Sequence, residues 1–168
     1  MRSDSATSSG RTYPAPWGTA LRWTSLGLVA FAILISSVFG SLDGSSVSFI
    51  TLCPTFILVL CLFFVVRSYE ITRHELLIHR LLWTTRLPLA GLKSAEAVPR
   101  AMSGSLRTCG NGGGFSFTGW YWSKALGHYR AFVTDMNRTV VLRFEKRTVV
   151  VSPAGPEEFV RQLTAQPS

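Results

Sequence analysis

Aromatic and basic side chains gather in one stretch of the sequence, which is the best candidate for a binding surface. Five aromatic residues stand between positions 115 and 122. Aromatic rings favour the headgroup depth of a membrane, and basic side chains attract anionic lipid. The candidate ligand- or lipid-binding residues are therefore Arg100, Arg107, Trp120, Tyr121, Trp122, Lys124 and Arg130. The sequence leaves open whether the rings of 115–122 face a membrane or fill the core of their own domain.

The chain offers no constellation for catalysis or for metal binding. It has three histidines (His74, His79 and His128), scattered carboxylates and no Gly-x-Ser-x-Gly elbow. Its three cysteines form no Cys-x-x-Cys pair and have no histidine at ligand spacing. The glycine-rich segment 109–114 lacks the Lys and Ser/Thr that complete a phosphate-binding loop, so we interpret it as a flexible loop. We predict no enzyme activity, no metal site and no cofactor.

Charge divides the chain into two unlike parts. The net charge is +8, and 15% of the residues are charged, against about 25% in an average soluble domain. Between residues 24 and 66 Asp43 is the only charged residue, whereas residues 67–168 carry 14 basic and 7 acidic side chains. This distribution excludes a wholly disordered chain and a disulfide-stapled miniprotein. It favours membrane segments followed by a basic domain.

The uncharged part predicts a transmembrane hairpin over residues 17–67. Two apolar runs, 21–39 and 47–66, each have the length that a helix needs to cross the roughly 30 Å hydrocarbon core. Lys and Arg are absent from the linker between them, so we expect a multi-pass protein of the inner membrane with both termini in the cytoplasm. Residues 1–16 are interpreted as a disordered tail. An open alternative is that the first run is a cleaved signal peptide.

Short apolar runs separated by turn residues predict a small β domain over residues 68–168. The candidate strands are 69–71, 76–82, 85–89, 93–98, 129–134, 140–145 and 148–151. After them, Pro156, two glutamates in the first turn and an apolar face ending at Leu163 predict an amphipathic helix. One helix can plug one end of a strongly bent sheet. We therefore expect an α+β fold that is mainly β.

Four short stretches of this region carry a resemblance to a known family. They are Tyr69-Glu70-Ile71-Thr72, Arg86-Leu87-Pro88-Leu89, Gly119-Trp120-Tyr121-Trp122 through Thr134, and Val151-Ser152-Pro153 before Glu158-Phe159-Val160. With the order of strands and the single final helix, they resemble the bacterial pleckstrin-homology-like (PH) domains, which are often attached to transmembrane helices. The resemblance spans residues 69–163. It implies a curved antiparallel sheet of about seven strands capped by a C-terminal helix, and no known catalysis.

These features together lead us to expect a membrane-anchored, PH-like binding or scaffolding module. The first hypothesis is protein–protein interaction or self-association at the inner membrane. The alternatives are recognition of anionic lipid or a small phosphorylated ligand, and a role as an accessory subunit of a membrane transport or secretion complex. The expected partners are the lipid bilayer and a protein partner or a second copy. Nucleic acid is not expected, because the sequence has no helix-turn-helix or RNA-recognition motif.

Overall fold

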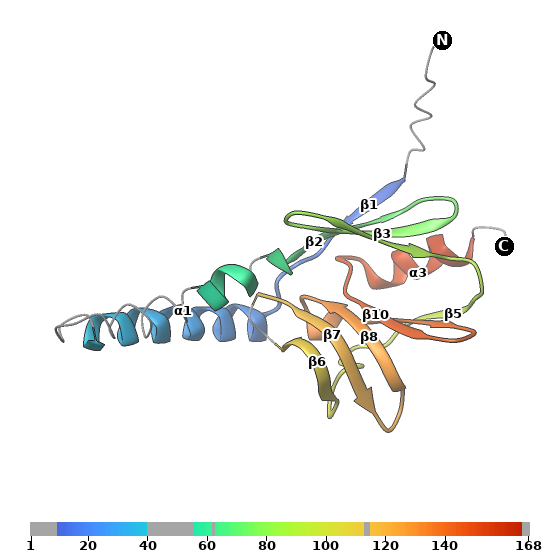
Figure 1. Ribbon diagram of the computed structural model, residues 1–168. Coiled ribbons are helices and arrows are strands. Elements are labelled where there is room, and N and C mark those ends of the chain that lie inside the picture. The colour runs from blue at the N-terminus through green and yellow to red at the C-terminus, as the bar shows by residue number, and fades with distance from the viewer. Residues whose placement is uncertain (1–9, 40–55, 62, 113–114, 166–168) are drawn as a thin grey trace, which may run out of the picture.

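The computed structural model describes residues 10–39, 56–61, 63–112 and 115–165. A long helix, α1, projects from one side of a β domain (Figure 1). Residues 56–61 and 63 are also helical. In chain order the elements are β1 (Arg11–Pro14), α1 (Thr19–Phe39), β2 (Val66–Ile71), β3 (Glu75–Arg80), β4 (Thr84–Pro88), β5 (Leu92–Ala97), β6 (Leu106–Gly112), β7 (Phe117–Ser123), β8 (Gly127–Val133), a 3-10 turn (Met136–Arg138), β9 (Val140–Phe144), β10 (Thr148–Val151) and α3 (Pro156–Thr164).

The strands form two sheets, in place of the single curved sheet that was expected. One sheet has the order β1-β2-β3-β4, and the other has the order β5-β9-β10-β8-β7-β6. The pair β8–β10 is parallel, whereas the other described pairs are antiparallel. Each of the seven predicted strands overlaps an observed one, although the predicted strand 76–82 runs past the end of β3 at Arg80, and the mainly β fold with a C-terminal helix is confirmed. The prediction of about seven strands was too low because β1, β6 and β7 were missed.

The prediction of a flexible loop over 109–114 was wrong where the structure describes that segment. Residues 109–112 belong to β6 and pair with β7 in antiparallel register, from Leu106 opposite Trp122 to Gly112 opposite Phe117. Residues 113 and 114 lie outside the described residues. Glycine is unfavourable in an isolated strand, but a neighbouring strand supplies the hydrogen bonds that overcome this preference.

The main core lies between the two sheets and is closed by α3. Tyr69 of β2 is fully buried there. Its hydroxyl donates to the carbonyl oxygen of Phe132 at 2.6 Å and accepts from the N–H of Ser152 at 3.2 Å. Burial raises the pKa of Tyr69 to about 12, so the hydroxyl remains a donor at neutral pH. One phenol group thus joins the first sheet to β8 and to the end of β10.

A second core covers the opposite face of the six-stranded sheet. Tyr121 and Tyr129 stack there at 5.9 Å between ring centres, and Leu21 of α1 is fully buried against the same cluster. A little further along α1, Ser25 Oγ accepts a hydrogen bond from the N–H of Phe115 at 3.1 Å. The beginning of α1 is therefore part of the β domain's packing.

Beyond Ser25, α1 presents large apolar side chains to its surroundings. The exposed ones are Leu26, Leu28, Val29, Phe31, Ile33, Leu34 and Val38. Among the described residues, α1 is the one helix that is long and apolar enough to cross a membrane. The predicted second helix, 47–66, is described in part: 56–61 and 63 are helical, Val66 already belongs to β2, and 47–55 and 62 lie outside the described residues.

The predicted disordered tail over residues 1–16 was wrong for its last part. Strand β1 pairs antiparallel with β2, from Arg11 opposite Ile71 to Pro14 opposite Ser68. The ring of Tyr13 is buried and meets the ring of Phe159 edge-on at 5.2 Å. A four-residue edge strand that ends in proline has no sequence alternation long enough to be recognised. Residues 1–9 lie outside the described residues.

The burial of Tyr13 leads to the first prediction. Tyr13→Ala removes a ring that packs on Phe159, and we expect it to lower the free energy of unfolding by about 3 kcal/mol. The measurement is chemical denaturation of the full chain in detergent. Arg11→Ala on the same strand is the matched control, because it removes the solvent-exposed ion pair with Glu158 and the contact of the guanidinium with the Tyr13 ring but leaves that ring in the core, and it is expected to cost less than about 1 kcal/mol. Equal, small effects of both substitutions would show that β1 does not hold the fold.

Candidate functional site

A pocket of about 420 Å³ lies where the end of β3 approaches the face of β6, β7 and β8. Three arginines from three different strands, Arg80, Arg107 and Arg130, line it, and no carboxylate is among its lining residues. The lining consists of Cys61, Phe64, Arg80, Arg107, Cys109, Gly110, Thr118, Gly119, Trp120 and Arg130. Cys61 and Phe64 come from the end of the helical segment that precedes β2. The pocket is therefore positively charged and partly apolar.

Arg80 is the unusual member of this group because it is buried without an anionic partner in the described parts of the chain. Its exposed fraction is 8%, and its Nε has no hydrogen-bond partner. Its guanidinium carbon lies 5.0, 5.4 and 5.7 Å from the ring centres of Phe132, Trp83 and Phe64. These distances are typical of cation–π contacts, which compensate a part of the lost hydration.

Electrostatics at Arg80 are unfavourable to the positive charge. Desolvation and, to a smaller extent, the charge of Arg130 lower the pKa of Arg80 to about 10. The side chain still carries its proton at neutral pH. Within the described parts of the chain, no carboxylate lies in ion-pair contact with any of the three pocket arginines. A bound anion would supply the missing partner.

Arg130 and Arg107 extend the charge toward solvent. The guanidinium carbon of Arg130 lies 4.9 Å from the ring centre of Phe132 and 5.9 Å from that of Trp120. Arg130 and Arg80 thus share one aromatic ring. Arg107 is exposed on the edge strand β6. Guanidinium groups that converge from several elements suit an oxyanion with several acceptor oxygens.

Two facing glycines allow β6 and β7 to approach each other closely where these strands line the pocket. Gly110 and Gly119 face each other in the ladder and have φ values of +114° and +146°. A Cβ atom on Gly119 would lie 2.2 Å from the carbonyl oxygen of Cys109, so only glycine permits this approach. A register shift between Arg107 and Cys109 marks an irregularity of β6 at the pocket. Such irregularities often redirect side chains at the rim of a site.

The structure brings together three of the seven residues proposed from the sequence. Arg107, Trp120 and Arg130 line the pocket. Arg100 and Lys124 are exposed at other places, Arg100 after β5 and Lys124 between β7 and β8. Trp122 is exposed on β7 but does not line the pocket.

Tyr121 does not fit the proposed binding role. It lies in the second core against Tyr129, and burial raises its pKa to about 12. Phe115 and Phe117 are buried as well, so the aromatic segment 115–122 is divided between core and surface. The alternation of β7 explains this division, because successive side chains point to opposite faces of a sheet.

Sequence reasoning missed Arg80, although a signal was present. Along β3 the buried side chains are Leu76, Ile78 and Arg80, so an arginine occupies the third inward position of an alternating strand. Charged residues are almost never buried unless they have a partner. An arginine in register with core residues was therefore the sequence feature that indicated a binding site.

Among the described residues, the Nε of Arg80 is the one buried side-chain nitrogen or oxygen without a hydrogen-bond partner. His79 contacts a carboxylate oxygen of Glu70 through Nε2 at 2.9 Å and Thr84 Oγ1 through Nδ1 at 3.0 Å. No group of three or more potential metal ligands occurs among the described residues.

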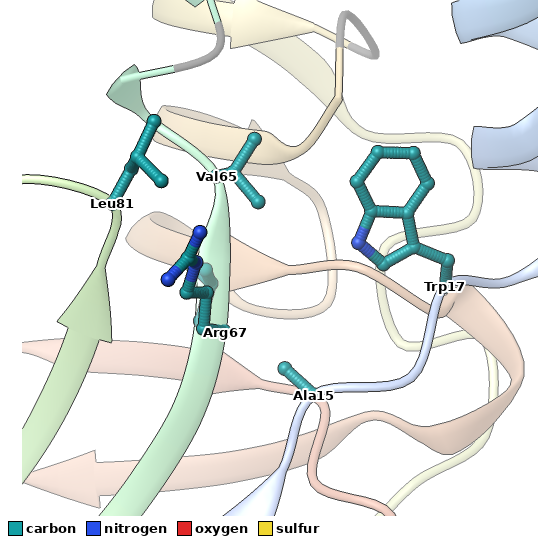
Figure 2. Close-up of a pocket in the computed structure, with 6 residues that line it drawn as sticks. Ala15, Trp17, Val65, Arg67 and Leu81 are labelled. Atoms are coloured by element: carbon teal, nitrogen blue, oxygen red, sulfur yellow. The ribbon is translucent and has the colours of Figure 1, made fainter.

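A second pocket, of about 390 Å³, lies near the start of β2. Figure 2 shows Leu81, Val65 and Trp17 around it, from three separate segments of the chain. Arg67 is the charged residue of its lining, and the convergence of charge seen in the first pocket is absent here.

Comparison with known proteins places most of the β domain in a described group. The sequence model of a family described as bacterial PH domain matches residues 67–166. This range includes almost all of β2 and continues through α3, and it leaves β1 and α1 outside. Neither the curated proteins nor the solved structures gave a match.

The unpartnered charge of Arg80 leads to the second prediction. Arg80→Met replaces the buried guanidinium with a shorter, unbranched apolar side chain, and we expect the free energy of unfolding to stay within about 1 kcal/mol of the wild type or to rise. A loss of several kcal/mol would instead mean that a partner within the protein stabilises the charge.

The same variant has an expected pH dependence. The pKa of Arg80 is lower in the folded state than in the unfolded state, so the unfolded state binds the proton more tightly. The cost of burying the charge is therefore fully present below pH 10 and declines as the pH rises above it. The stability of the wild type relative to Arg80→Met should thus be constant below about pH 9 and increase as the pH rises above about 10, as measured by denaturation at each pH.

Proposed function

We propose a function from the premise that this chain belongs to the bacterial PH domain family: it is a membrane-anchored binding module whose arginine pocket takes a phosphate-bearing anion. The observation that carries the proposal is Arg80, which is buried and positively charged and has no anionic partner among the residues that the structure describes. Arg107 and Arg130 add two further cations to the same pocket. The proposal includes no catalytic step.

Phosphate matches this pocket in charge and in geometry. A phosphate group offers several oxygens to guanidinium donors, and arginine binds such groups in a bidentate manner. Phe64 and Trp120 add apolar surface beside the charges. A lipid headgroup and a free phosphorylated molecule share this chemistry.

The pairing of β1 with β2 supports the proposed membrane hairpin. Strand β1 precedes α1, strand β2 follows the helical residues 56–61 and 63, and both strands lie in one sheet. If α1 crosses the membrane, the chain must cross back before Val66. Cleavage of a signal peptide near residue 40 would remove β1 from its sheet, so the pairing disfavours that alternative. The basic residues Arg22 and Arg67 flank the apolar segments on the side of the domain, which favours a cytoplasmic domain in the inner membrane.

A second candidate function is protein–protein interaction or self-association through β6. This strand is an edge of the six-stranded sheet, and its side chains from Leu106 to Cys109 are exposed. Leu106 stands opposite Trp122, which is also exposed. An open edge with apolar neighbours suits the addition of a strand from another chain.

The third prediction tests the pocket in the full chain. In a neutral detergent, a short-chain phosphatidylglycerol is expected to raise the Tm of the wild type, because a ligand that binds only the folded state stabilises it. At about 100 times Kd, the stabilisation is about 2.7 kcal/mol. The increase should be lost in Arg80→Met and in Arg130→Gln, and short-chain phosphatidylcholine should have little effect.

Controls distinguish the source of the phosphate from general charge attraction. Arg143→Gln removes an exposed cation of β9 outside the pocket and should keep the full Tm increase. An increase with inorganic phosphate alone would favour a free phosphorylated ligand over a lipid headgroup. An increase of the same size in Arg80→Met and in the wild type would refute the pocket as the site.

The fourth prediction concerns topology. In a variant without native cysteines, Ser168→Cys should react with a membrane-impermeant maleimide only after the cells are permeabilised. Ser45→Cys, between the two apolar runs, should react in intact cells. The reverse pattern would exclude the proposed orientation, and a mature chain that begins near residue 40 by mass spectrometry would establish signal-peptide cleavage.

A further inference from the structure

The turn between β3 and β4 has an unusual composition. Its residues are Arg80, Leu81, Leu82 and Trp83, and the N–H of Arg80 donates to the carbonyl oxygen of Trp83 at 3.0 Å. Tight turns normally use Gly, Pro, Asn, Asp or Ser, because these residues suit the turn backbone and interact with water. Here the apex consists of two leucines and a tryptophan. Leu82 is 65% exposed and Trp83 is 41% exposed.

This apolar apex is continuous with the end of the helical segment that precedes β2. The ring of Trp83 meets the ring of Phe64 edge-on, at 5.4 Å between centres and 89° between planes. Phe64 follows the last helical residue and is itself exposed. Figure 1 shows the apex of the β3–β4 hairpin directed toward the helical part of the protein.

Polar groups stand directly behind the apex. Arg80 places its guanidinium carbon 5.4 Å from the Trp83 ring centre, and Thr84 and Thr85 follow Trp83 in the chain. An apolar tip followed by an aromatic ring, a cation and hydroxyl groups reproduces the order of a membrane from its hydrocarbon edge to its headgroups.

From this geometry we infer that the β3–β4 apex, Leu81–Trp83, inserts into the interfacial layer of the bilayer beside the end of the helical segment. The occupant of this surface is lipid, because the apex continues the apolar surface of a segment that itself ends at the membrane. The inference rests on the membrane anchoring of the proposed function. It also deepens that function: Arg80 belongs to both the turn and the arginine pocket, so insertion of the apex holds the pocket at headgroup depth. The phosphate source that follows is a lipid headgroup.

The test places one nitroxide probe at a time on the full chain in nanodiscs that contain phosphatidylglycerol. In a background with Cys53, Cys61 and Cys109 replaced by Ser, the probe is attached at Leu82→Cys, Arg143→Cys or Leu34→Cys. Arg143 is the control, because it is exposed on β9, outside both the pocket and the β6 edge. Leu34, on α1, reports the anchoring itself. The measurement is the ratio of collision rates with oxygen, which is enriched in lipid, and with a water-soluble nickel chelate.

At Leu82 the ratio of oxygen to nickel collisions should be several-fold higher than at Arg143 and lower than at Leu34. Equal ratios at Leu82 and Arg143, with a lipid-like ratio at Leu34, would overturn the inference and leave the anchoring intact. Protection of Leu82 from both reagents would also overturn it, because a protein surface would then cover the apex. A water-like ratio at Leu34 would refute the anchoring and the inference together.

Discussion

The pairing of β1 with β2 is the constraint on which the arrangement of the molecule depends. It joins a strand before α1 to a strand that follows the helical residues 56–61 and 63, so both ends of the apolar region meet in one sheet. The pairing is reinforced by side chains, since Tyr13 packs on Phe159 of the C-terminal helix. Residues from the start, middle and end of the chain therefore form one core. Because β1 lies outside the region matched by the bacterial PH domain family, this chain adds a strand to the matched region.

Contacts between the apolar segments and the β domain fix the position of the arginine pocket. The N–H of Phe115 donates to Ser25 Oγ of α1 at 3.1 Å, and Ser116 Oγ donates to the carbonyl oxygen of Phe64 at 3.0 Å. Two successive residues between β6 and β7 are thus hydrogen-bonded to α1 and to the residue that follows the helical residues 56–61 and 63. The pocket is walled by the same strands and by Phe64 itself. These two hydrogen bonds hold the pocket close to α1 and to the segment that precedes β2.

The main core also positions two of the arginines that line the pocket. Tyr69 holds the backbone of β8 through its hydrogen bond to the carbonyl oxygen of Phe132, and the ring of Phe132 lies against the guanidinium groups of Arg80 and Arg130. One residue therefore connects the buried hydrogen-bond network with the charged pocket. Two like charges at one ring repel each other, and an anion between or beside them would relieve that repulsion. The proposed affinity for phosphate is in this sense a consequence of how the two sheets pack.

The sequence by itself determined the elements whose signals are local. Three elements show this. The apolar run of α1 has the length and composition of a long helix, and the alternation of Val140, Leu142 and Phe144 indicates the strand β9. The proline and the two glutamates mark the start of α3. The tertiary structure alone decided which residues meet. The short strand β1 and the glycine-rich β6 depend on hydrogen bonds from distant strands, and the separation of Trp120 from Tyr121 depends on which face of β7 is covered. The alternation of β3 places Arg80 on the inward face, but only the packing of the rings of Phe132, Trp83 and Phe64 around it shows that its charge is buried at a pocket.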